Sequence, residues 1–96
     1  MKLSSQQVAD ELAAMQGWTL EGATIRKSFS FRSFPDAIAF ATRLAFDVEA
    51  ADHHPDIHVS YRTVTLAWTT HSAGGLTAKD FNGARQSDFI AARMTG

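Results

Sequence analysis

Residues 57–68, Ile-His-Val-Ser-Tyr-Arg-Thr-Val-Thr-Leu-Ala-Trp, alternate apolar and polar side chains in two short runs. Alternation with a period of two is typical of strands that bury one face. A hairpin turn centred on residues 62–63 would place Ile57 opposite Trp68. Because the apolar faces of both strands agree in this register, we expect Tyr61 and Trp68 to lie in the core.

A helix and two further strands are predicted ahead of this hairpin. Ser4 or Ser5 can cap a helix that ends near Gly17. Two short strands then follow, over residues 18–21 and 24–31. The apolar positions of the helix recur at helical spacing: Val8, Leu12 and Met15.

The longest predicted helix begins at Ser33 and stops near residues 52–53. Ser33 can cap it, a proline follows in the first turn, and Asp36 favours the positive end of the helix dipole. Pro55 biases His54 away from helical geometry, which ends the helix. One apolar stripe is expected to face the core: Phe34, Ile38, Ala41, Leu44, Ala45 and Val48.

A last helix is predicted from Thr77 to about Met94. Residues 74–75 are both glycine and break the chain, and Thr77-Ala-Lys-Asp80 is a capping-box variant with Asp in place of Glu or Gln. Gly83 inside this helix costs about 1 kcal/mol relative to alanine, so we expect a packing reason for it. The order α-β-β-α-β-β-α predicts an α+β fold: a four-stranded antiparallel sheet with helices packed on one face and a partly polar opposite face.

Composition limits the possible functions. We expect one domain, 1–96, because smaller pieces could not bury separate cores. The 9 basic and 10 acidic side chains give a formal charge of -1, which favours neither nucleic acid nor an anionic membrane as partner. There is no apolar stretch of membrane-spanning length and none that follows Lys2 as in a secretory signal, so we expect a cytoplasmic protein. Cysteine is absent, which excludes disulfides and thiolate metal sites.

All four histidines fall within residues 53–71. In the register above, His54 lies opposite His71 at the open end of the hairpin, and His53 is adjacent at the end of the preceding helix. His58 alternates onto the polar face, so we expect it to be exposed and outside the site. Imidazole is suited to proton transfer at neutral pH, and the cluster therefore predicts acid–base chemistry.

Two carboxylates are placed to act on this cluster. Glu49 and His53 are four residues apart on one helix, so Glu49 would favour the protonated imidazole; the alternative is a solvated ion pair at the helix end. Asp80 lies in the first turn of the last helix and is reached from His71 through a short glycine loop. Asp80 can cap that helix, orient an imidazole, or do both.

A metal centre and a nucleophilic enzyme fit the pattern less well. No His-x-x-x-His pair or other familiar ligand spacing occurs, and the adjacent His53 and His54 would point apart. Cysteine is absent, and no serine lies in a Gly-x-Ser-x-Gly context. We therefore expect no metal ligands among these residues.

The segment 49–55, Glu-Ala-Ala-Asp-His-His-Pro, followed by Tyr61, His71 and Asp80, resembles the pterin-4a-carbinolamine dehydratase family. The shared pattern is Glu-x3-His-His-Pro-x5-aromatic-x9-His-x8-Asp, without gaps. The expected element order also matches the fold of that family over nearly the whole chain. Several spaced polar residues agree by type, which makes the resemblance more specific than a single glycine motif.

The resemblance implies a lyase that dehydrates 4a-hydroxytetrahydropterin to quinonoid dihydropterin and water, recycling the pterin used by aromatic amino acid hydroxylases. One group would protonate the departing 4a-hydroxyl while another removes the N5 proton, with no metal or redox cofactor. By position, His53 and His71 are the acid–base candidates, without assignment of which is acid and which is base, and His54 is the pterin-binding one. Asp80 would position a histidine or the pterin ring. The expected catalytic set is His53, His54, His71 and Asp80, and the expected substrate-binding set is His54, Glu49, Pro55 and Asp80.

Three hypotheses for the function follow. The first is the dehydratase, acting as a homodimer or homotetramer. The second is a non-catalytic interaction module, like the animal members that act as transcriptional coactivators by dimerising a homeodomain factor. The third is an enzyme of the same fold acting on a pterin of molybdenum-cofactor metabolism. Animal members often carry an aromatic residue where this chain has Ile57, which leaves the pocket lining open. Phe46 projects from another side of its helix than the apolar stripe, as a peripheral packing residue or a subunit contact.

Overall fold

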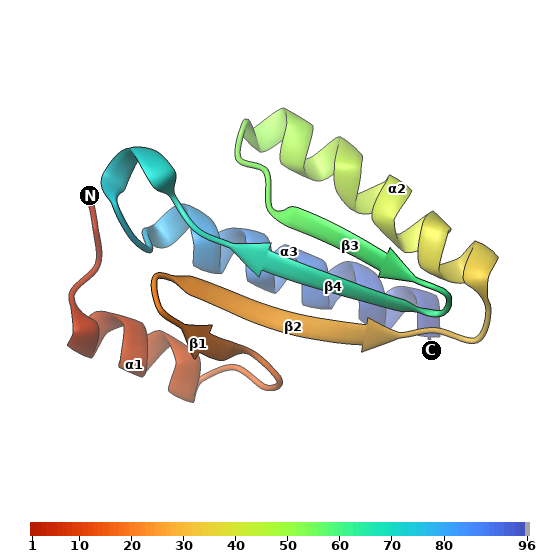
Figure 1. Ribbon diagram of the computed structural model, residues 1–96, viewed down its shortest axis with the longest axis horizontal. Coiled ribbons are helices and arrows are strands. Elements are labelled where there is room, and N and C mark those ends of the chain that lie inside the picture. Colours follow the sequence, from red (N-terminus) through yellow and green to blue (C-terminus); the bar gives the residue numbers. More distant parts are fainter. Residues whose placement is uncertain (96) are drawn as a thin grey trace.

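The computed structural model describes residues 1–95 and has the element order predicted from the sequence (Figure 1). The helices are α1 (Ser5–Ala13), α2 (Phe34–Ala51) and α3 (Ala78–Thr95), with a short 3-10 helix, η1 (His71–Ala73). The strands are β1 (Thr19–Glu21), β2 (Thr24–Ser30), β3 (Asp56–Ser60) and β4 (Thr63–Trp68). They form one antiparallel sheet in the order β1-β2-β4-β3. The predicted α+β fold is therefore confirmed.

Local capping signals define the ends of α1 and α2. The hydroxyl of Ser4 caps α1 within a capping box, and α1 ends at Ala13, earlier than the predicted end at Gly17. Gly17 instead takes a φ of 85° in the turn that follows. The hydroxyl of Ser33 caps α2 by accepting a hydrogen bond from the backbone N–H of Asp36 at 3.2 Å. The helix ends where Asp52 takes a left-handed φ of 53°. Both predicted helix starts are confirmed.

The β3–β4 hairpin turns one residue earlier than predicted. Val59 pairs with Val64, so the turn consists of residues 61–62 and every pair differs by two positions from the predicted register. Tyr61 takes the left-handed φ of 52° that a tight two-residue turn requires, and 69% of its surface is exposed. The predictions of the register and of a buried Tyr61 were wrong, because Tyr61 belongs to the turn and not to the ladder. A shift of two residues keeps every side chain on its predicted face, and Trp68 is buried as expected.

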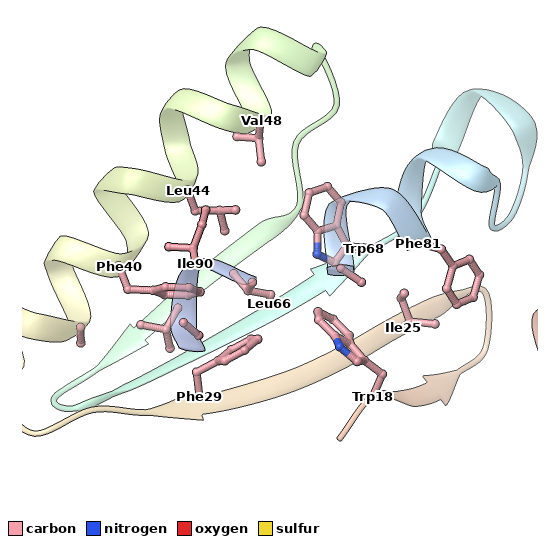
Figure 2. Close-up of a cluster of buried hydrophobic side chains, with 14 of the residues drawn as sticks. Trp18, Ile25, Phe29, Phe40, Leu44, Val48, Leu66, Trp68, Phe81 and Ile90 are labelled. Atoms are coloured by element: carbon pink, nitrogen blue, oxygen red, sulfur yellow. The ribbon is translucent and has the colours of Figure 1, made fainter. Parts of the chain in front are cut away.

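The core lies between one face of the sheet and the helices, as Figure 2 shows for side chains of α2 that point toward the strands. The buried residues of α2 are Ala37, Phe40, Leu44 and Val48. The predicted stripe was right at Leu44 and Val48, but Phe34, Ile38 and Ala45 are exposed and Ala41 is only partly buried. This helix is apolar on two adjoining faces, so packing against the sheet selects the face that is buried.

Close packing against Trp68 explains Gly83. A Cβ atom at Gly83 would lie 2.4 Å from the indole ring, so only glycine lets α3 approach the sheet at this point. The predicted packing reason for a glycine inside a helix is thereby confirmed.

The other face of the sheet carries no helix among residues 1–95 (Figure 1). Its side chains are mainly polar and include the exposed Arg26, Ser28 and Ser30 of β2. His58 is exposed on this face, as predicted. Within the same residues, no helix is both long enough and apolar enough to cross a bilayer.

Candidate active site

His53 lies at the end of the sheet on the side that the helices cover. Extending the observed register outward from β3 places His53 opposite Thr70, just beyond β4. The His53 ring stacks on the indole of Trp68, with 5.6 Å between ring centroids. Its Nε2 atom donates a hydrogen bond to Oδ1 of Asp80 on α3, at 2.6 Å. The fold therefore joins two residues that lie 27 positions apart in the sequence.

Asp80 is completely buried and is held by donors from three directions. Its Oδ2 atom accepts from the hydroxyl of Thr70 (2.7 Å) and from the backbone N–H of Thr77 (2.9 Å), while Oδ1 accepts from His53. Because the Thr70 hydroxyl donates to the carboxylate, the Thr77 hydroxyl donates to Thr70, at 2.9 Å. Asp80 thus both caps α3 and orients an imidazole, and the two roles that the sequence left open are combined in one carboxylate.

The contact with Asp80 determines which nitrogen of His53 is available. A carboxylate accepts hydrogen bonds, so Nε2 carries the proton in the neutral ring. Nδ1 makes no hydrogen bond to another residue of the described chain, 1–95. Proton exchange with a bound molecule would therefore occur at Nδ1 of His53.

His54 and His71 lie on the opposite, uncovered side of the sheet. Side chains alternate between faces along an extended segment, so the adjacent His53 and His54 point to different sides. His54 and His71 both line a pocket of about 120 Å³, together with Asp56, Ala67 and Thr69. The predicted direct opposition of His54 and His71 was wrong, because the observed register puts His54 opposite Thr69. The two imidazoles nevertheless share one pocket.

Glu49 contacts His54 and not the predicted His53. Nε2 of His54 donates to Oε1 of Glu49 at 2.8 Å, and both side chains are largely exposed. The prediction from four-residue spacing was wrong because α2 ends at Ala51, and the chain beyond it turns the His53 ring inward to Asp80. A solvated pair of this kind contributes little to stability.

A second pocket lies on the helix-covered side, next to His53. It measures about 160 Å³ and is lined by His53, Trp68 and residues of α2 and α3 that include Val48, Lys79 and Gly83. Of the predicted site residues, only His53 lines this pocket, whereas His54 and His71 line the pocket on the uncovered side of the sheet. Pro55 is buried and lines neither pocket, and among residues 1–95 no group of three or more His, Asp or Glu side chains is arranged to hold a metal ion.

The prediction of the site missed Thr70, Thr77, Arg26 and Asp56. Thr70 and Thr77 hold the carboxylate of Asp80, and Arg26 and Asp56 line the pocket of His54 and His71. Thr77 had a usable signal as the first residue of the capping box. Arg26 comes from a distant strand, and its place beside β4 depends on the pairing of β2 with β4.

Known proteins resemble this chain over nearly its whole length. A family model described as Pterin 4 alpha carbinolamine dehydratase matches residues 1–90. A relative from Roseiflexus sp. (strain RS-1), whose name marks it as a candidate pterin-4-alpha-carbinolamine dehydratase, is 53% identical over 89 residues, which cover 93% of this chain and 96% of the relative. A similar relative from Nocardia farcinica (strain IFM 10152) is 47% identical over 89 residues, covering 93% of this chain and 94% of that one.

Solved structures agree with this similarity. A transcriptional coactivator/pterin dehydratase from Brucella melitensis has a TM-score of 0.90 at 33% identity, covering 95% of this chain and 99% of that one. A pterin dehydratase-like RuBisCO assembly factor of the α-carboxysome has a TM-score of 0.64 at 23% identity, covers 77% of this chain and 86% of that one, and shares the fold. The chain belongs to the pterin-4a-carbinolamine dehydratase family.

Proposed function

We propose that the protein dehydrates 4a-hydroxytetrahydropterin by acid–base catalysis with histidine side chains. The observation that carries the proposal is the arrangement of one oriented imidazole, His53, and two accessible ones, His54 and His71, around the end of β4 in a chain of this family. The product pterin would return to the cycle of an aromatic amino acid hydroxylase.

The chemistry needs two proton transfers and no redox step. A proton donated to the 4a-hydroxyl lets the C4a–O bond break, and the oxygen leaves as water. Loss of the proton on N5 supplies the electrons for a C4a=N5 double bond, which gives the quinonoid dihydropterin. One imidazole in the protonated form and one in the neutral form are sufficient for this exchange.

The surroundings of each histidine suggest how the work is divided. His71 makes no side-chain hydrogen bond to another described residue, so both of its ring nitrogens are available to substrate. His53 has one nitrogen bound to Asp80, which orients the ring and leaves Nδ1 for proton exchange. His54 is steadied by Glu49 and would contact the pterin from the pocket wall. Because His53 lines the pocket on the helix-covered side and His71 lines the one on the uncovered side, the proposal requires the reacting edge of the pterin to lie at the end of β4, within reach of both. We leave the acid and base labels interchangeable between His53 and His71.

The test is a dehydration assay with 4a-hydroxytetrahydropterin on wild type, His53→Ala and His71→Ala. Each alanine variant should lose about 100- to 10,000-fold in kcat/KM, the usual contribution of a general acid or base. His58→Ala is the matched control, because His58 is exposed on the same sheet and lines neither pocket. A wild-type rate equal to the spontaneous rate would contradict the dehydratase and favour a non-catalytic role. Full activity in both alanine variants would contradict the assignment of the site.

We further propose that the protein is a homo-oligomer. Phe46 is 74% exposed on α2, so it does not pack within the chain, and Phe34 and Ile38 are exposed on the same helix. An exposed apolar surface of this kind is typical of a subunit contact. Light scattering at micromolar concentration should give a dimer or tetramer, and Phe46→Glu should shift it toward monomer. A wild-type monomer would reject this proposal.

A further inference from the structure

Three side chains form a straight row across the uncovered face of the sheet. Ala67 of β4 pairs with Asp56 of β3 on one side and with Arg26 of β2 on the other. Since neighbouring strands are about 4.8 Å apart, the Cα atoms of Asp56 and Arg26 are separated by roughly 10 Å. Ala67 between them is only 8% exposed and has a small side chain, so it forms a flat floor. All three residues line the pocket that also contains His54 and His71.

The two ends of this row carry charges with free hydrogen-bonding capacity. The carboxylate of Asp56 makes no hydrogen bond or ion pair with another residue in the described part of the chain. Arg26 uses its Nε atom for an ion pair with Glu21 at 3.2 Å, and its two terminal nitrogens have no partner among those residues. The pocket thus offers a carboxylate acceptor at one end and guanidinium donors at the other.

We propose that the carboxylate of Asp56 binds the 2-amino group and the N3–H of the pterin, and that Arg26 donates hydrogen bonds to its 6-substituent. The pterin ring would lie on Ala67, between the two. The 2-amino group and the N3–H of a 2-amino-4-oxo pteridine are two parallel donors. One carboxylate can accept both of them, as it does from a guanidinium. The C6 end of the bicyclic ring lies opposite that edge, where Arg26 can donate to hydroxyl or anionic groups of the substituent.

This inference rests on the proposed function, because it assumes that a pterin occupies the pocket of His54 and His71. It assigns the selection of substrate to residues other than the proton-transfer groups. The same row would disfavour a 2-oxo pteridine, because a carboxylate repels a carbonyl oxygen at that position. Asp56 is therefore a specificity-determining residue for 2-amino pteridines.

The experiment measures equilibrium binding of two probes that differ only at C2, namely 6-methyl-7,8-dihydropterin and 6-methyl-7,8-dihydrolumazine, by their fluorescence. Wild type should bind the 2-amino probe at least about 10-fold more tightly, and Asp56→Asn should lose most of this preference, since an amide can donate to a 2-oxo group. Asp10→Asn, which removes an exposed carboxylate from the distant α1, should keep the wild-type preference. Arg26→Gln should weaken binding of 7,8-dihydrobiopterin more than binding of the 6-methyl probe.

The outcomes separate this inference from the proposed function. Dehydration by wild type with an unchanged 2-amino preference in Asp56→Asn would overturn the inference and leave the function standing. Selective, Asp56-dependent binding without dehydration would support the inference and contradict the function. Failure of wild type to bind either dihydropterin would overturn both. The Asp56 carboxylate has no partner in the described chain, so Asp56→Asn should keep the wild-type melting temperature. A measured melting temperature equal to that of wild type excludes misfolding as the cause of a changed preference.

Discussion

His53 and His54 are neighbours in the sequence, yet the fold places them in opposite environments. His53 faces the helices, stacks on Trp68 and donates to a carboxylate that is itself completely buried. His54 faces solvent, and its partner Glu49 is exposed as well. Both contacts join an imidazole to a carboxylate at similar distances, 2.6 Å and 2.8 Å. Distance alone therefore does not distinguish the two pairs.

What separates them is the number of other interactions that each carboxylate makes. Asp80 accepts from Thr70 and Thr77 besides His53, and it is shielded from water, so its loss would leave several donors unsatisfied. Glu49 is exposed, so if its carboxylate is removed, water can take its place as the hydrogen-bond partner of His54 without such a cost. The side of His53 is thus preorganised by buried contacts, and the side of His54 is open to solvent.

The largest effect should come from removing the buried carboxylate. Asp80→Ala should lower the free energy of unfolding by about 3–5 kcal/mol, because it removes one partner of a buried pair and the cap of α3. Urea denaturation measures this loss. A cost below about 1 kcal/mol would mean that the two sides of the site do not differ as described.

A slightly smaller effect is expected where α3 touches Trp68. Gly83→Ala should destabilise the protein by about 2–3 kcal/mol even though alanine is the better helix former, because the new methyl group overlaps the indole. Thermal unfolding of Gly83→Ala in wild-type and Trp68→Leu backgrounds is the appropriate measurement. If the cost is the same in both backgrounds, contact with the indole is not its cause.

The hydroxyl of Thr70 provides a finer test. Thr70→Val removes the donor to Asp80 and should cost about 1–2 kcal/mol, whereas Thr70→Ser should recover most of it. Thr65→Val is the matched control on the uncovered face, where the Thr65 hydroxyl contacts Ser28 at 2.8 Å in an exposed position and should contribute about 0.5 kcal/mol or less. Equal costs at the two threonines, in urea titrations, would contradict the contrast between the two faces.

The smallest effect is expected at Glu49. Glu49→Gln should change the free energy of unfolding by less than about 0.5 kcal/mol, and 1 M salt should reduce even this difference. Denaturation at low and high ionic strength provides the measurement. A loss near that of Asp80→Ala would show that exposure does not weaken the pair of Glu49 and His54.

The sequence predicted most of the fold because the relevant signals are local. The cap at Ser33, the alternation in β3 and β4 and the capping box at Thr77 each act within a few residues of the chain. The hairpin register was not predictable from this pattern. A shift by two residues leaves every side chain on the same face, so the apolar pattern fits both registers, and only the turn geometry at Tyr61 separates them.

The candidate site divides in the same way. Spacing identified His53, His54, His71 and Asp80 as a group, and alternation along an extended segment already implied that His53 and His54 point apart. Neither spacing nor alternation identified the hydrogen-bond partners of these two histidines. Glu49 is a plausible neighbour of both histidines, and the end of α2 decides between them.

By itself, the sequence determined the order of the elements, the face of each strand and the residue types available for proton transfer, because these depend on short-range geometry. Only the tertiary structure decided that Asp80 joins His53, that His71 shares a pocket with His54, and that Arg26 and Asp56 face each other across Ala67. Those contacts join segments far apart in the chain, and they depend on strand order and helix packing, which act on the whole domain at once.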